Sequence, residues 1–73
     1  MEVQQVVERR HLPDTEERRR LRIEAQLNLD DIAELVGVTA SAVSRWERGT
    51  RTPTGSRRVA YVAILRELDE VLR

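Results

Sequence analysis

Apolar residues recur at intervals of three and four along most of this 73-residue chain, the spacing of α-helices with one buried face. The longest such stretch runs over residues 56–72 and predicts a final long helix. Its residues at this spacing are Tyr61, Ile64, Leu65, Leu68 and Leu72, and the first four are assigned to the core. Together with three shorter stretches before it, the pattern predicts an all-α domain of four to five helices.

Residues 1–13 are expected to form either an N-terminal arm or a short extra helix, because their three valines span little more than one turn. A helix over residues 14–26 should follow and open the main domain, residues 14–73. Asp14 is a suitable N-cap, and Glu17 stands at the capping-box spacing from it. The apolar side of this helix is thin, so other side chains are expected to help cover the core: Ile23, or the stems of Arg18 and Arg22.

A third stretch predicts a short helix over residues 29–36. Asn28 is its expected N-cap, and Asp30 and Asp31 suit the positive end of the helix dipole. Its core-facing residues are expected to be Ile32, Leu35 and Val36. Gly37 can adopt the left-handed conformation that ends a helix in a sharp turn.

The next helix is predicted over residues 39–48. Thr39 is its expected N-cap, and Gly49 ends it in the same way as the glycine before. Residues 49–55 contain two glycines and a proline, and their composition predicts a loop before the final helix.

Two short helices joined by a glycine-containing turn make a helix-turn-helix. Ala33 stands four residues before Gly37, where two crossing helices leave room only for a small side chain. Inward-facing positions are all apolar: Ile32, Val36, Val38, Val43 and Trp46. A generic pair of helices has no reason to meet all of these requirements, so the pattern favours the helix-turn-helix.

Composition narrows the function classes. The chain has no cysteine and one histidine, which excludes disulfides and thiolate zinc sites and argues against an enzyme. No metal or cofactor is expected. No apolar run approaches the roughly 20 residues of a membrane span, so we expect a cytoplasmic protein, associated with the nucleoid or, if phage-encoded, in the host cytoplasm.

The net charge is zero, with 13 basic and 13 acidic residues, but the charge is unevenly distributed. Residues 39–58 contain five arginines and one acid, net +4, whereas residues 1–38 carry net −3. A local basic segment is what phosphate binding needs, although arginines also decorate ordinary solvated surfaces.

Residues 27–49, followed by Arg51 and Pro53, resemble the Cro/repressor-type helix-turn-helix proteins of phages and bacteria. The resemblance extends over about residues 18–68 and includes the signature Glu47-x-Gly49-x-Arg51-x-Pro53. It implies a compact, lambda repressor-like domain that binds double-stranded DNA with its second motif helix in the major groove, as a small transcriptional regulator. Two departures are a leucine, Leu29, where the family often has glutamine, and one long helix after Pro53 in place of two short ones.

The resemblance also assigns site residues. Base edges would be read by Ala40, Ser41, Ser44 and Arg45. Arg45 is the strongest candidate, since a guanidinium pairs bidentately with guanine, although a phosphate contact or a salt bridge is the alternative. Structural positions of the motif are Arg22, Ala33, Gly37, Val43, Trp46, Glu47 and Gly49. Among these, Arg22 and Glu47 match a partly buried ion pair of the family.

Phosphate contacts are expected at both ends of the recognition helix and beyond it. The candidates are Asn28, Thr39, Arg48, Arg51, Thr52, Arg57 and Arg58, the last two being alternatively solvated. Trp46 is expected in the core rather than stacked on a base. His11 is expected to be solvated, and the acids Glu16, Glu17, Asp30 and Asp31 to serve the helix dipoles rather than catalysis or a metal.

Three functions fit these features. The first is a sequence-specific transcriptional regulator, of Cro or repressor type and repressing. The others are an excisionase-like architectural DNA-binding protein and an antitoxin-like protein-interaction module. Apolar residues left over on the final helix suggest a homodimer contact: Val59, Val62, Ala63, Val71 and Leu72. Because a short chain also needs apolar surface for its own core, we expect a monomer or a weak dimer that pairs mainly on DNA.

Overall fold

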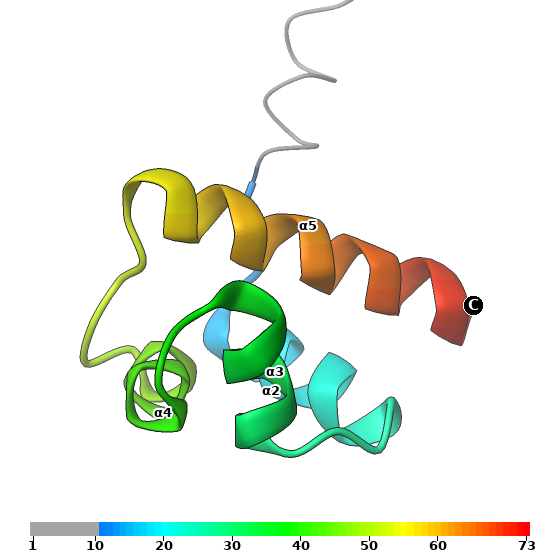
Figure 1. Ribbon diagram of the computed structural model, residues 1–73. Helices are drawn as coiled ribbons and strands as arrows, with labels where there is room; N and C mark the ends of the chain where they lie inside the picture. Colours follow the sequence, from blue (N-terminus) through cyan, green and yellow to red (C-terminus); the bar gives the residue numbers. More distant parts are fainter. Residues whose placement is uncertain (1–10) are drawn as a thin grey trace, which may run out of the picture.

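The computed structural model describes residues 11–73, which form four α-helices (Figure 1). They are α2 (Thr15–Glu24), α3 (Leu29–Val36), α4 (Ala40–Arg48) and α5 (Gly55–Leu72). The long α5 lies across α2 and α3, while α4 packs against the same two helices. This arrangement confirms the all-α fold. Most of the expected N-terminal arm, residues 1–10, lies outside the described residues.

Three of the helices begin at the predicted N-caps. The side-chain oxygens of Asp14, Asn28 and Thr39 each accept a hydrogen bond from the backbone N–H three residues later. Each bond satisfies an N–H that has no partner inside its helix. The three caps set where α2, α3 and α4 start, within one residue of the predicted positions.

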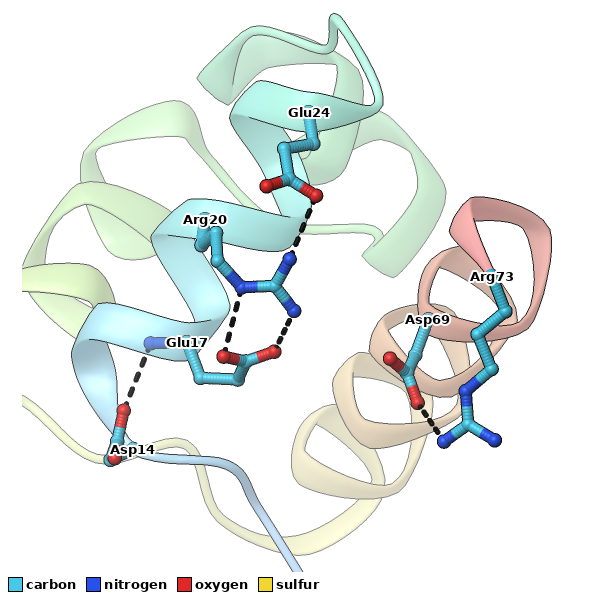
Figure 2. A network of polar contacts seen from close by, with 6 residues as sticks. All are labelled: Asp14, Glu17, Arg20, Glu24, Asp69 and Arg73. Atoms are coloured by element: carbon cyan, nitrogen blue, oxygen red, sulfur yellow. Dashed lines mark hydrogen bonds and ion pairs between the residues drawn. The ribbon is translucent and has the colours of Figure 1, made fainter.

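The capping box forms in α3, not in α2 as predicted. Asn28 Oδ1 accepts from the Asp31 N–H at 2.8 Å, and Asp31 Oδ2 accepts from the Asn28 N–H at 2.8 Å. In α2, Asp14 makes its half of the box, but the Glu17 carboxylate turns along the helix to pair with Arg20 (Figure 2). A guanidinium one turn away is a stronger partner for that carboxylate than a neutral N–H.

The core is aliphatic apart from one pair of aromatic rings. Its buried residues are Leu12, Leu21, Ile32, Ala33, Val43, Trp46, Tyr61, Val62 and Leu65. The rings of Trp46 and Tyr61 lie with centroids 4.9 Å apart, so Trp46 joins α4 to α5. The prediction that Trp46 is a core residue is confirmed.

Two assignments need correction, since Leu35 is 60% exposed and Val62 is buried. Of the two alternatives for covering the core beside α2, Ile23 is 52% exposed, whereas Arg18 and Arg22 are partly buried. On α3 the buried face is centred between Ile32 and Ala33, and a residue two positions after Ala33 lies well away from it at about 100° per residue. Val62 is buried because α5 packs on two helices and therefore buries a wide face.

The exposed face of α5 is accordingly narrower than expected. Val62 belongs to the core and Leu72 packs against it, so neither is free for a contact with a second chain. Val59, Ala63 and Val71 remain exposed. Within residues 11–73, no helix is long and apolar enough to cross a membrane.

Candidate nucleic-acid interface

The turn between α3 and α4 is built around Ala33 and Gly37. The Ala33 carbonyl accepts from the N–H groups of Gly37 at 2.8 Å and Val38 at 2.9 Å, which closes the end of α3. Gly37 adopts φ +86°, in the left-handed region that favours glycine. The two helices pack against each other, Ala33 on α3 is buried, and Val43 on α4 is completely buried. These contacts confirm the predicted helix-turn-helix geometry.

The predicted base-reading residues occupy the outer part of α4. Ser41 and Arg45 are exposed and lie one turn apart, on the same face of the helix. Ala40 and Ser44 are half-buried, and Ala40 packs against the core. The side chains most available to a ligand on this helix are therefore Ser41 and Arg45.

An open hollow of about 500 Å³ lies beside α4. It is lined by Gly37, Val38, Thr39, Ala42, Arg45, Trp46, Arg51, Thr52 and Arg57. The three arginines come from α4, the following loop and the start of α5. The structure thus brings together five of the predicted DNA-contacting residues. The other six lie outside the hollow: Asn28, Ala40, Ser41, Ser44, Arg48 and Arg58.

Carboxylate partners distinguish these arginines from others in the chain. Within residues 11–73, the ion pairs join Arg20 to Glu17 and Glu24, Arg22 to Glu47, and Arg73 to Asp69. None of them involves an arginine of the hollow. Their positive charge is not neutralised by a neighbouring carboxylate of the described chain, as a surface for a polyanion requires.

Arg22 and Glu47 form the ion pair that the family resemblance implies. Arg22 Nε and Nη2 donate to the two Glu47 carboxylate oxygens at 2.6 and 2.9 Å, and Nη1 donates to the Leu27 carbonyl at 3.0 Å. The side chains are 14% and 7% exposed. Hydrogen bonding to the Glu47 carboxylate raises the pKa of Arg22 above its ordinary value. The pair ties α2 to the last turn of α4.

A comparison with known protein families agrees with the helix-turn-helix seen in the structure. A helix-turn-helix family model covers residues 19–70, most of the chain and the whole of α3, α4 and the hollow. The chain belongs to the Cro/repressor-type helix-turn-helix family. This membership supports DNA binding of the transcription-regulator type. No curated protein and no solved structure matches the chain significantly.

Two features of this helix-turn-helix protein were not predicted from its sequence. The Tyr61 hydroxyl is buried and has no hydrogen-bond partner among the described residues. Burial raises the pKa of Tyr61 to about 12, and the negative charge of Glu47 adds to the shift. The second feature is Arg18, whose guanidinium binds two backbone carbonyls. Neither has a local sequence signal, because Trp46 lies 28 residues from Arg18 and the Tyr61 hydroxyl is buried by the packing of α5 on other helices.

Other predictions concern residues away from the interface. His11 is exposed. Glu16, Glu17, Asp30 and Asp31 lie in the first turns of α2 and α3, as the dipole argument predicted. Within residues 11–73, no three histidine, cysteine or acidic side chains come together as a metal site would require.

Proposed function

We propose that this chain is a small transcriptional regulator, of Cro or repressor type, that binds a specific double-stranded DNA sequence with α4 in the major groove. The observation that carries the proposal is the convergence of Arg45, Arg51 and Arg57 around one hollow beside α4. Repression is the expected outcome, since a protein bound over an operator blocks access to it. The function is binding rather than catalysis, and it would be exercised in the cytoplasm, at the nucleoid.

Base reading is assigned to the exposed face of α4. Arg45 would pair bidentately with guanine O6 and N7, and Ser41 would hydrogen-bond a neighbouring base. Ala40 and Ser44 have less exposed surface, so we assign them apolar or minor contacts. Selectivity would therefore depend mainly on Arg45.

Phosphate contacts are assigned to the residues around this face. They are Asn28, Thr39, Arg48, Arg51, Thr52, Arg57 and Arg58. For Asn28 the side-chain oxygen is engaged in the cap of α3, so the amide N–H groups would donate to the phosphate. Arg51 and Arg57 would hold the strand that passes over the hollow.

We further propose that the protein is a monomer or weak dimer in solution and pairs mainly on DNA. The exposed apolar surface of α5 is small, because Val62 and Leu72 serve the protein's own core. Sedimentation at tens of micromolar tests this proposal. A tight dimer without DNA that is dissociated by Val71→Asp, with helicity retained, would contradict it.

Selection of bound sites from random duplexes, followed by titration at several salt concentrations, tests the DNA-binding function. If four to five arginines meet phosphates or the groove, log K should fall with log salt at a slope of about −4. Arg51→Gln should make the slope shallower by about one, whereas Arg66→Gln on α5, outside the hollow, should not change it. Absence of binding at low salt would instead favour a protein-interaction module.

A further inference from the structure

Arg18 joins three separate parts of the molecule through its guanidinium. From α2 its Nε donates to the Pro13 carbonyl at 2.5 Å, and its Nη1 donates to the Trp46 carbonyl at 2.9 Å. The side chain is partly buried. The first carbonyl belongs to the chain that enters the domain, and the second belongs to the recognition helix α4.

The Trp46 carbonyl lies in the last turn of α4, where carbonyl oxygens lack the usual donors of a helix. The Gly49 N–H donates to it at 3.2 Å, and Arg18 supplies a second, charged donor. A cation at this end also suits the helix dipole. Arg18 therefore acts as a C-terminal cap supplied by a different helix.

Arg22 holds the same turn of α4 from one helical turn further along α2. It binds the Glu47 carboxylate, while Arg18 binds the carbonyl of the preceding residue. These two contacts from one face of α2, made by Arg18 and Arg22, hold the orientation of α4 as well as its position. Since α4 has nine residues and is about 13 Å long, a change of tilt at this end moves Ser41 near its other end.

The last turn of α4 also positions the backbone of the loop residues beside the hollow. The Arg45 carbonyl accepts from the N–H groups of Thr50 at 3.0 Å and Arg51 at 3.4 Å. Loosening the last turn of α4 would therefore shift Arg45 relative to Arg51. These are the side chains assigned to base reading and to phosphate binding.

We infer that Arg18 is a positioning residue for DNA recognition, and this inference rests on the proposed function. It does not touch DNA. It holds the end of α4 against α2 and the chain at Pro13, and thereby directs Arg45 toward the bases and keeps Arg51 at the phosphates.

Arg18→Met tests the inference, because methionine retains an apolar stem and removes every donor. Arg19→Met is the matched control, an exposed arginine beside it on α2 with no hydrogen bond or ion pair among the described residues. We expect Arg18→Met to lower affinity for the selected site about tenfold and to reduce discrimination between selected and unselected duplexes. Combined with Arg45→Ala, it should cause little further loss of discrimination, because both act on the same contact.

A readout without DNA separates this inference from the proposed function. Amide hydrogen exchange at Gly49, Thr50 and Arg51 should accelerate several-fold in Arg18→Met and not in Arg19→Met. If Arg18→Met does not fold, Arg18→Lys, which keeps the charge but lacks the forked donors, supplies the same comparison.

Unchanged exchange, unchanged discrimination, or losses that simply add to those of Arg45→Ala would each overturn the role of Arg18. If the unmodified chain binds no duplex, the proposed function fails and the recognition role fails with it. The exchange rates would still show whether Arg18 holds the end of α4.

Discussion

The arginines of α2 and those between α4 and the start of α5 differ in what surrounds them. On α2, Arg20 lies between Glu17 and Glu24 along the helix, and Arg22 is paired with Glu47 (Figure 2 shows the first set). Around the hollow, Arg45, Arg51 and Arg57 have no carboxylate partner among residues 11–73. Two of the four arginines of α2 thus have a carboxylate partner, whereas none of the three arginines around the hollow has one among the described residues.

The difference arises from the spacing of acids along the chain. On α2, acids stand three or four positions from arginines, where helix geometry lets them meet. In residues 39–58 the single acid is Glu47, and it is engaged by an arginine of α2. The ion pair between α2 and α4 therefore also engages the one carboxylate of the segment that contains Arg45, Arg51 and Arg57, the arginines that we propose to contact DNA. An evenly distributed net charge of zero would have no such surface.

Breaking the partly buried ion pair between Arg22 and Glu47 should give the largest effect on this comparison. Glu47→Ala leaves the Arg22 guanidinium in a site where its side chain is 14% exposed, without its partner. We expect the free energy of unfolding to fall by about 3 kcal/mol, measured by urea denaturation. Glu24→Ala, which removes an exposed partner of Arg20, is the control and should leave the midpoint unchanged within error. Equal shifts in the two variants would show that burial does not distinguish the pairs.

The next largest effect concerns two arginines without a carboxylate partner in the described part of the chain, Arg45 and Arg51, and should separate base reading from phosphate binding. Arg45→Ala is expected to cost about 1–3 kcal/mol of discrimination at one or two base pairs. Arg51→Ala should weaken binding to all duplexes about equally, because a phosphate carries no sequence information. Binding to a panel of single-base variants of the selected site measures both. If the two variants give the same pattern, the division between base reading and phosphate binding is wrong.

A smaller effect is expected from the unpaired hydroxyl beside the buried pair. The pKa of Tyr61 is raised to about 12 in the folded protein, mainly by burial, whereas a phenol in an unfolded chain titrates near 10. As the pH rises, Tyr61 therefore loses its proton in the unfolded chain before it does so in the folded protein. The contribution of Tyr61 to the free energy of unfolding is complete below about pH 10 and falls as the pH rises toward 12. At pH 11 the loss should be roughly 1 kcal/mol in urea denaturation. Tyr61→Phe, which keeps the ring, should lack this decline; the same decline in both proteins would assign it to other groups.

The smallest effect should come from the exposed arginine that is already paired. Arg20→Gln is expected to change neither the unfolding midpoint nor the affinity for DNA, because its charge is neutralised by Glu17 and Glu24 at the surface. Arg57→Gln removes the same charge from the hollow and should lower affinity several-fold, with a shallower salt dependence. Equal losses from the two variants would show that net charge alone, and not its partners, governs binding.

The sequence by itself determined the elements and most of their ends, although α2 stops at Glu24, two residues before the predicted end. Asn28, Thr39, Gly37 and Gly49 were all predicted at the helix ends where the structure places them. Each acts through its own backbone or through a hydrogen bond to a residue three or four positions away, so a short window of sequence contains the whole interaction. The membership of Arg45 and Arg51 in one basic segment was visible for the same reason.

Only the tertiary structure decided which side chains are buried and which contacts form between residues far apart in the chain. Val62 is buried because α5 packs on both α2 and α3, and Leu35 is exposed because α3 buries the face centred between Ile32 and Ala33; the apolar pattern along one helix does not specify which face the other helices cover. Arg18 reaches a carbonyl 28 residues away, and the Tyr61 hydroxyl is enclosed without a partner by packing among three helices. These outcomes depend on how whole helices fit together. Because protein interiors are closely packed, the burial of one side chain depends on all the side chains around it.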